Sequence, residues 1–175
     1  MIRTIYLLSL WLLLFTGCAE KRASERTEEK DKQKTTSVFN TSAIQKLKYT
    51  DYALSGEAED AVAGWEKYKE LAIQIEYLKD GDLSFFNGDK VLLTDFLKVF
   101  KEELPEVLTT RPILSRVTLV ETMILKLNDD LTLTNIEADD KLNSVLEVLI
   151  AFSNLNLQID KKLERDIYDQ IEPPN

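Results

Sequence analysis

The chain has 175 residues, with 22 Lys and Arg against 31 Asp and Glu, and its formal net charge is −9. It contains no histidine and one cysteine. This composition excludes histidine-dependent triads, haem or copper sites with such ligands, the usual histidine-bearing zinc sites and the Glu-x-x-His pairs of di-iron bundles. An acidic chain also repels phosphate, so nucleic acid is not an expected partner.

The N-terminus has the three parts of an export signal. Arg3 is the basic residue, residues 5–15 form an apolar run, and two small residues precede Cys18. The run is too short to span a membrane, which needs about 20 predominantly apolar residues, and charged residues follow at once. Residues 1–17 are therefore predicted to be a signal peptide that is removed.

The sequence Phe-Thr-Gly-Cys at residues 15–18 resembles the lipobox of bacterial lipoproteins, although the family usually has Leu, Val or Ile where Phe15 stands. The resemblance implies that Cys18 becomes the first mature residue and carries covalent lipid, such as palmitate. A lipid thioether would also remove a lone exposed thiol from an oxidising compartment. By the same resemblance, Ala19 in place of Asp favours the outer membrane, with the protein facing the periplasm. The alternative is ordinary secretion, or an uncleaved signal anchor, with an incidental cysteine.

Residues 18–40 are predicted to be the lipidated Cys18 followed by a flexible tether. After Cys18 they are nearly all charged or small, with no apolar residue larger than Ala before Val38, and such a segment cannot bury enough surface to become ordered. A coil of this length spans roughly 25 Å. The tether is nearly neutral, whereas residues 41–175 have 15 basic and 26 acidic residues. Adhesion of this acidic part to an anionic membrane is disfavoured, which leaves the lipid as the attachment.

Residues 41–175 show helical periodicity and are predicted to form one helical domain. In the first segment, apolar residues recur at spacings of three or four and predict one helix over residues 58–78. Ser55 is its predicted N-cap, and residues 79–82 are its predicted stop. The predicted core face consists of Ala61, Trp65, Tyr68, Ala72, Ile75 and Leu78.

Four further helices are predicted from the same pattern. The second covers residues 87–104 and ends before Pro105, the third begins near Pro112, the fourth begins near Asp140, and a short fifth is capped near Asp160. Their predicted core residues are Leu92, Leu93, Phe96, Val99, Phe100 and Leu104; Ile113, Val117, Val120, Ile124 and Leu127; Leu142, Val145, Leu146, Leu149, Ile150 and Phe152; and Leu163, Ile167 and Ile171.

Two segments, residues 130–137 and 154–160, have a partly alternating apolar pattern that could indicate strands. Two isolated short strands would lack partners, so both segments are interpreted as loops between helices. The predicted fold class is therefore all-α, an antiparallel bundle of about four to five helices after a disordered tether.

Two acidic segments were compared with the calcium-binding loop of EF-hands. The segment that starts at Asp80 has Phe85 at the glycine position and Val91 where the bidentate Glu belongs, and residues 128–139 have Leu133 at the glycine position. Neither segment fits, so both are expected to be solvated loops, with no metal site and no cofactor apart from the lipid.

Two groups of side chains are candidates for binding. Trp65, Tyr68 and Tyr77 could line a ligand pocket, but aromatic residues at helical spacing belong more often to the core. Arg116 and Glu121 lie among apolar residues, where the Arg116 stem can follow the edge of the core. Alternatively, these two residues form an internal polar contact with another helix, or a binding site.

No catalytic residues are identified. The predicted function is that of a non-enzymatic, lipid-anchored helical module that binds another component of the cell envelope. The alternative is a periplasmic binding protein for a small ligand or cation held between helices.

Overall fold

The computed structural model describes residues 40–171 and confirms the all-α prediction for them. The predicted signal peptide, Cys18 and almost all of the predicted tether lie outside the described residues. Residues 40–171 form helices and the segments between them, without a strand. The elements are α3 (Thr41–Ile44), α4 (Gly56–Val62), α5 (Glu66–Lys79), α6 (Lys90–Glu102), the 3-10 helix η2 (Glu106–Leu108), α7 (Arg111–Thr132) and α8 (Ala138–Gln170).

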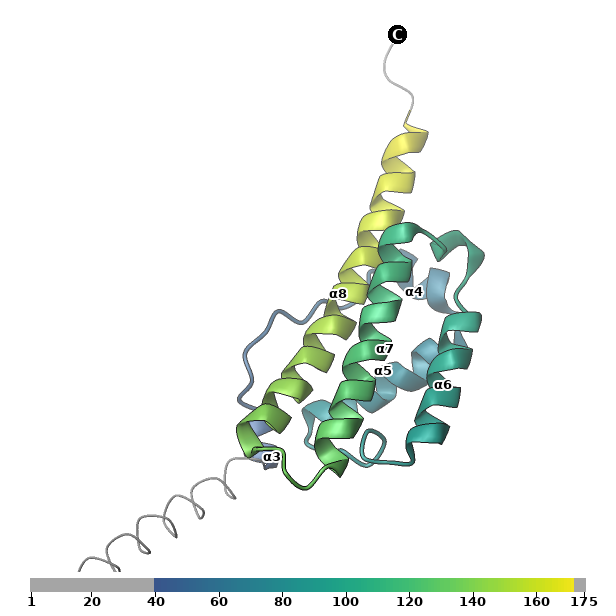
Figure 1. The fold of residues 1–175 in the computed structure, drawn as a ribbon. Coiled ribbons are helices and arrows are strands. Elements are labelled where there is room, and N and C mark those ends of the chain that lie inside the picture. Colours follow the sequence, from purple (N-terminus) through teal and green to yellow (C-terminus); the bar gives the residue numbers. More distant parts are fainter. Residues whose placement is uncertain (1–39, 172–175) are drawn as a thin grey trace, which may run out of the picture. The chain divides into compact units, whose positions relative to one another are not determined.

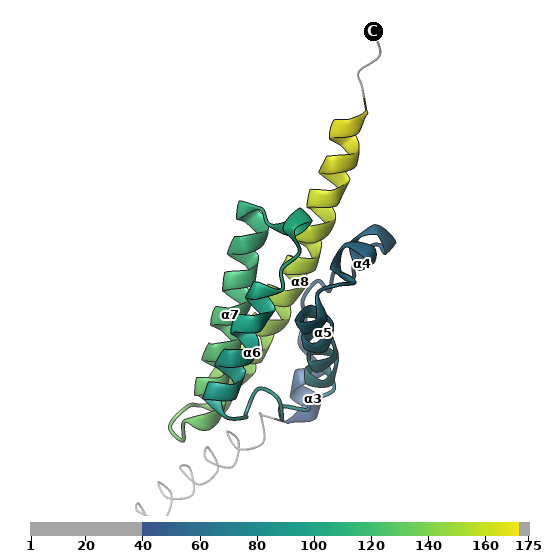
Figure 2. The same ribbon diagram turned by 90° about the vertical axis from the view of Figure 1, so that its right-hand side faces the viewer.

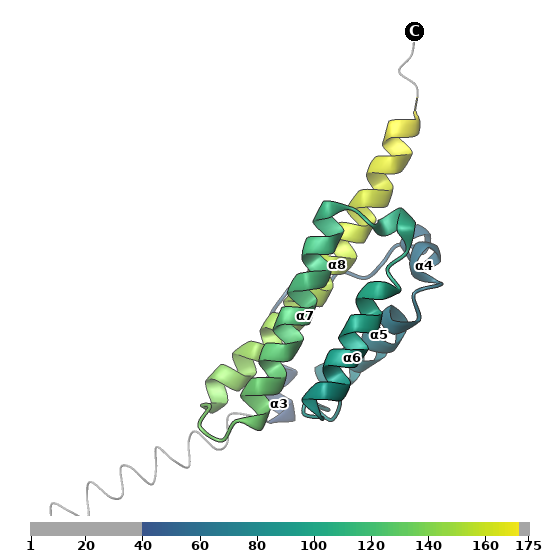
Figure 3. The ribbon, with the colours of Figure 1, turned by 45° about the vertical axis from the view of Figure 1, so that its right-hand side comes forward.

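The helices form two layers. α6, α7 and α8 lie in one layer, and α3, α4 and α5 lie behind it (Figures 1 and 2). α3 lies beside the turn between α7 and α8, whereas α8 ends at the opposite end of the bundle (Figure 3). The two ends of the described chain are therefore far apart along the bundle.

The antiparallel hairpin of α7 and α8 is the centre of this arrangement. All five predicted core residues of the third helix are buried in α7, as expected for one apolar face with a period of 3.6 residues. The Lys126 ammonium lies 2.5 Å from Glu147, and the Ser144 hydroxyl donates to Asp130. α7 continues to Thr132, so the predicted loop at residues 130–137 is wrong in its first part.

α6 packs antiparallel to α7, and two ion pairs connect the ends of α6 to the last turn and to the middle of α7. Lys90 pairs with Asp129, and Lys101 pairs with Glu121, each at 2.6 Å. The N-cap of α6 is Asp89, whose carboxylate accepts from the first backbone N–H groups of the helix. α6 buries Leu93, Leu97 and Phe100. Leu92 is 70% exposed, so its prediction as a core residue is wrong, and Leu97 was not predicted.

The predicted helix over residues 58–78 is interrupted at residues 63–65, and α4 and α5 are separate helices. The Trp65 indole N–H donates a 2.7 Å hydrogen bond to the Phe100 carbonyl near the end of α6. In return, the Glu103 carboxylate accepts from the Lys67 N–H in the first turn of α5 at 2.7 Å. This exchange satisfies backbone groups that a helix end leaves unpaired. Trp65 and Tyr68 are both buried, so the apolar spacing continues across the break. Periodicity alone therefore could not reveal the interruption.

The beginning of α4 and the end of α5 lie close to the predicted bounds of the single helix. Ser55 is the N-cap of α4 and accepts from the Ala58 N–H at 3.3 Å. After α5, Gly81 adopts a φ of 88°, and the N–H groups of Gly81 and Asp82 bond back to Leu78 and Tyr77, which is a Schellman motif. A Cβ on Gly81 would approach the Thr41 side chain within 2.8 Å, so both backbone and packing require glycine.

α8 runs without interruption from Ala138 to Gln170, so the predicted loop at residues 154–160 and the separate fifth helix are wrong. Leu155, Asn156 and Ile159 are buried within this continuous helix, whereas Ile150, predicted to be in the core, is 39% exposed. One predicted helix is divided and two are joined. Five helices of seven or more residues therefore remain among residues 40–171, in agreement with the predicted number.

Two buried polar residues of α8 hold the segment between α3 and α4. The Tyr52 N–H donates to Ser153 Oγ at 2.8 Å, and the Ser153 hydroxyl donates to the Thr50 carbonyl at 2.7 Å. Asn156 donates to the Tyr52 carbonyl at 2.9 Å and accepts from the Tyr68 hydroxyl at 2.7 Å. These bonds satisfy an irregular backbone segment and also connect α5 to α8.

Among residues 40–171, α8 alone has the length and apolar composition of a membrane-spanning helix. Of its apolar window, 56% is buried inside the bundle, which is also the pattern of a core helix in a soluble protein. The buried side chains Ser144, Ser153 and Asn156 are hydrogen-bonded within the bundle. These contacts are those of a central bundle helix.

Candidate interaction surface

The predicted aromatic cluster is divided between the core and the surface. Trp65 stacks on Phe100 with ring centroids 4.7 Å apart, and Tyr68 stacks on Phe152 at 5.5 Å. Burial, followed by the nearby carboxylates, raises the pKa of the Tyr68 phenol above its ordinary value. Tyr77 is 52% exposed. The core interpretation is thus confirmed for Trp65 and Tyr68, and the three residues do not form one pocket.

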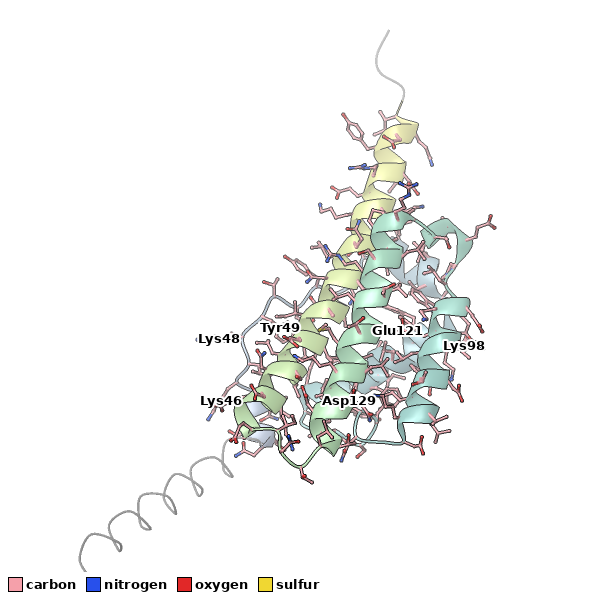
Figure 4. All side chains as sticks on the ribbon, in the orientation of Figure 1. Lys46, Lys48, Tyr49, Lys98, Glu121 and Asp129 are labelled. Atoms are coloured by element: carbon pink, nitrogen blue, oxygen red, sulfur yellow. The ribbon has the colours of Figure 1, made fainter. Side chains whose placement is uncertain are left out.

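Arg116 and Glu121 have different environments. Glu121, which is labelled in Figure 4, pairs with Lys101 of α6, so it contacts another helix, but this contact is exposed and is not the internal one that was considered. Arg116 is half-buried on α7, and it has no ion pair within the described part of the chain. The two residues therefore do not make a joint site.

Carboxylates of the two acidic segments serve local structure, and the second segment is not the solvated loop that was expected, because residues 128–132 belong to α7 and residues 138–139 to α8. Asp82 accepts from the Ser84 N–H at 2.8 Å, and its hydrogen bonds with Ser84 lower the pKa of the carboxyl. Asp89 caps α6, and Asp129 and Asp130 bind partners on α6 and α8. No group of three or more Asp, Glu, His or Cys residues suitable for a metal ion is found among residues 40–171.

The C-terminal end of α8 projects from the bundle (Figure 1), and we call residues 160–171, which include the C-cap Ile171, the α8 tip. The contacts of Lys126 with Glu147 and of Asp130 with Ser144 show which residues of α7 and α8 lie at the same level along the bundle. Because both helices rise by the same distance per residue, Arg111 at the start of α7 is level with about Lys162. The remaining turns of α8 extend roughly 12 Å past α7.

An apolar stripe of the core continues onto the α8 tip. Ile159, Leu163, Ile167 and Ile171 follow one another at intervals of four residues and therefore lie on neighbouring turns of one face. Their exposure increases along this series: Ile159 is fully buried, Leu163 is half-buried, and Ile167 and Ile171 are 47% and 66% exposed. Ile167 and Ile171 were predicted to be core residues. That prediction is wrong, because the helices that would cover them end too early.

An acidic hollow borders this stripe on the side of α4. It has a volume of about 310 Å³ and is lined by Ser55, Glu57, Asp160, Glu164 and Ile167. Asp160 is held in place because its Oδ1 accepts from the Ser55 N–H at 3.0 Å and from the Ser55 hydroxyl at 2.8 Å. Glu57 and Glu164 are exposed. Sequence reasoning identified Ser55 and Asp160 only as helix caps, since the contact between residues so distant in sequence depends on the fold.

Two further hollows follow α8. One, of about 240 Å³, lies between Ile150 and Asn154 of α8 and the segment containing Lys48 and Tyr49 (Figure 4). The other, of about 480 Å³, is lined by charged residues of the α8 tip and by Tyr168, which is 74% exposed. Both are shallow surface features. The α8 tip, where exposed apolar residues recur on successive turns of a projecting helix end, is therefore the candidate interaction surface.

The fold and this surface define an all-α domain whose last helix extends past its own bundle. No family model, no curated protein and no solved structure matches the chain. Its functional interpretation therefore depends on the residues themselves.

Proposed function

We propose that this protein is a lipid-anchored, non-enzymatic module of the bacterial cell envelope that binds another envelope protein through the α8 tip. The observation that carries the proposal is the exposure of Ile167, Tyr168 and Ile171 on a helix end that projects from the bundle. Exposed apolar groups clustered in this way are typical of protein-binding surfaces.

The position of the α8 tip suits an anchored protein. Residue 40, where the predicted tether from Cys18 joins the helices, belongs to the end of the bundle beside α3, and the α8 tip is at the opposite end (Figure 3). A lipid on Cys18 would hold the domain near the membrane, and the tether would let the α8 tip reach a partner. Confinement of this kind raises the effective concentration of a partner in the same envelope without adding a contact.

The alternative, a small ligand held between helices, has less support. Trp65 and Tyr68 fill the core, and the hollows described above lie on the surface along α8. We therefore favour a macromolecular partner. The proposed location of the protein is the outer membrane, where it would face the periplasm.

Site-specific photo-crosslinking in the native cells tests the proposal. A photoreactive residue in place of Tyr168 should give a discrete crosslinked product, whereas the same residue in place of Tyr77, which is also exposed, should not. Mass spectrometry of the mature N-terminus should show a lipidated Cys18 and the loss of residues 1–17. An exported Cys18→Ser variant should fold normally but give much less of the crosslinked product at native expression.

Several results would contradict this function. An intact Met1 or a free Cys18 thiol in the membrane fraction would exclude the proposed anchor. Equal crosslinking from Tyr168 and Tyr77 would show that the α8 tip is not a specific binding surface. Turnover of a substrate by the purified protein would exclude the non-enzymatic interpretation.

A further inference from the structure

We propose that the α8 tip binds a basic amphipathic helix of the partner protein, with the apolar face of that helix on the stripe of Ile167 and Ile171 and its cations at the acidic hollow. This inference rests on the proposed function, because it specifies the chemistry of the partner at the same surface.

The apolar part of the surface has the geometry of a helix-packing ridge. Leu163, Ile167 and Ile171 are spaced by four residues, and rows of this spacing are the ones that interlock when two helices pack. Inside the bundle the same row, at Ile159, is covered by other helices. A helix that covers Ile167 and Ile171 would thus extend an existing packing arrangement by about two turns.

The carboxylates beside the ridge favour a partner with positive charge. Three carboxylates, those of Glu57, Asp160 and Glu164, line the hollow next to Ile167, and no Lys or Arg lines it. Asp160 is hydrogen-bonded by the neutral groups of Ser55 and forms no ion pair in the described structure, although the charge of the neighbouring Lys161 interacts with it. Glu164 pairs with Lys161, but both side chains are well exposed, at 69% and 61%. Lys or Arg side chains on the flank of an incoming helix would complement this hollow and favour the correct orientation.

Two other occupants are disfavoured by the same residues. A second copy of this chain would bring another acidic domain, with 26 acidic and 15 basic residues in its residues 41–175, so it complements the acidic hollow less well than a basic helix does. Like charges in such a contact are unfavourable. The predicted tether of the same chain has no apolar residue larger than Ala between Ala19 and Val38, and it could not cover the ridge.

The test uses the full-length protein, purified from cells that export it and reconstituted in phosphatidylcholine nanodiscs. The probe is a fluorescent Leu/Lys amphipathic peptide of about 18 residues, long enough to form a helix. Matched probes are a Leu/Glu peptide and a scrambled Leu/Lys peptide without an apolar face, and empty nanodiscs provide the background. We expect the Leu/Lys peptide to bind at least tenfold more tightly than either matched probe, and salt of about 0.5 M to weaken the binding.

Two pairs of variants locate the binding. Glu57→Lys/Glu164→Lys should weaken binding of the Leu/Lys peptide at least tenfold, whereas Glu66→Lys/Glu102→Lys, which also reverses exposed helical carboxylates, should change it less than twofold. Ile167→Asp/Ile171→Asp should weaken it at least tenfold. Its matched control is Ile73→Asp/Leu92→Asp, where the exposed fractions are 53% and 70%. Circular dichroism should show the same helicity in all four variants.

The inference is overturned if the Leu/Lys peptide fails to bind, if both charge-reversal pairs weaken it equally, or if the Leu/Glu peptide binds as tightly. Self-association that Ile167→Asp/Ile171→Asp abolishes would also overturn it and would assign the ridge to a second copy. If the Tyr168 crosslink forms in cells while the Leu/Lys peptide does not bind, only the chemistry of the partner is wrong, and the proposed function stands.

Discussion

The two parts of α8 contrast sharply although they form one continuous helix. Between Ala138 and Ile159 one side of the helix is covered by other elements, and its buried polar groups are hydrogen-bonded. Among residues 40–171, no buried side-chain nitrogen or oxygen lacks a hydrogen-bond partner. In the α8 tip, charged residues form exposed local pairs, such as Lys161 with Glu164, and the apolar residues after Leu163 are exposed. The first part therefore stabilises the fold, while the second leaves apolar surface available for a partner.

The largest expected effect comes from a cavity in the first part of α8. Leu155 is fully buried, so Leu155→Ala should reduce the free energy of unfolding by about 2–5 kcal/mol through lost burial and the cavity that remains. Ile167→Ala, in the α8 tip, should reduce it by less than about 0.5 kcal/mol because that side chain is already 47% exposed. Urea denaturation of the full chain measures both values. Similar losses would show that the α8 tip is packed in solution.

Removing the side-chain amide of Asn156, which connects α8 to α5 and to the segment before α4, should reduce the free energy of unfolding by a somewhat smaller amount. Asn156→Ala would leave the Tyr68 hydroxyl and the Tyr52 carbonyl without their partners, at a cost of roughly 2–3 kcal/mol. The matched variant is Asn154→Ala, where the side chain is half-buried and makes no hydrogen bond in the described structure. It should be neutral within about 0.5 kcal/mol by the same urea assay. An equal cost for both variants would mean that the Asn156 bonds are not formed.

The pH dependence of stability should report the burial of the Tyr68 phenol, which is hydrogen-bonded to Asn156. Burial first, and then the charges of Asp160 and Glu59, raise the pKa of Tyr68 above the ordinary value of 10.0. Because the folded pKa is raised, the contribution of Tyr68 is fully present below pH 10 and is lost as the pH rises further. The loss approaches about 1.4 kcal/mol per pH unit for one proton. Tyr68→Phe should therefore show a shallower decline of stability between about pH 10 and 11.5 than the wild type. Parallel declines would show that Tyr68 titrates normally.

Sequence periodicity predicted the all-α class and most of the buried positions, because those depend on local spacing. All five core residues proposed for the third helix are buried, and the stop after α5 is confirmed by the positive φ of Gly81. The interruption at Trp65 was not predictable in this way. It depends on hydrogen bonds with Phe100 and Glu103, which are distant in sequence, while the apolar spacing continues through it.

Periodicity also could not distinguish the candidate surface from the core. Ile167 and Ile171 have the spacing of core residues, and only the lengths of the neighbouring helices show that they are uncovered. Conversely, residues 154–160 were predicted to be a loop because their alternating pattern would have made an unpartnered strand, but Asn156 is a buried helical side chain whose partners come from two other segments. Cys18 was identified from local sequence alone, and its lipidation remains a prediction.

Removing most of the α8 tip should have only a small effect on stability. A chain that ends after Leu163 loses Ile167, Tyr168 and Ile171 but keeps the bonds between Asp160 and Ser55. Tolerance of truncation follows from the burial and hydrogen bonding of what is removed, and here the removed side chains are mostly exposed. The free energy of unfolding should therefore fall by less than about 1 kcal/mol. A chain that ends after Leu155 instead loses Asn156 and Ile159 from the core and should not fold cooperatively. Circular dichroism with urea titration distinguishes the two. If the shorter deletion also prevents folding, the α8 tip is part of the folding unit, and its exposed isoleucines could not be assigned to partner binding by mutation.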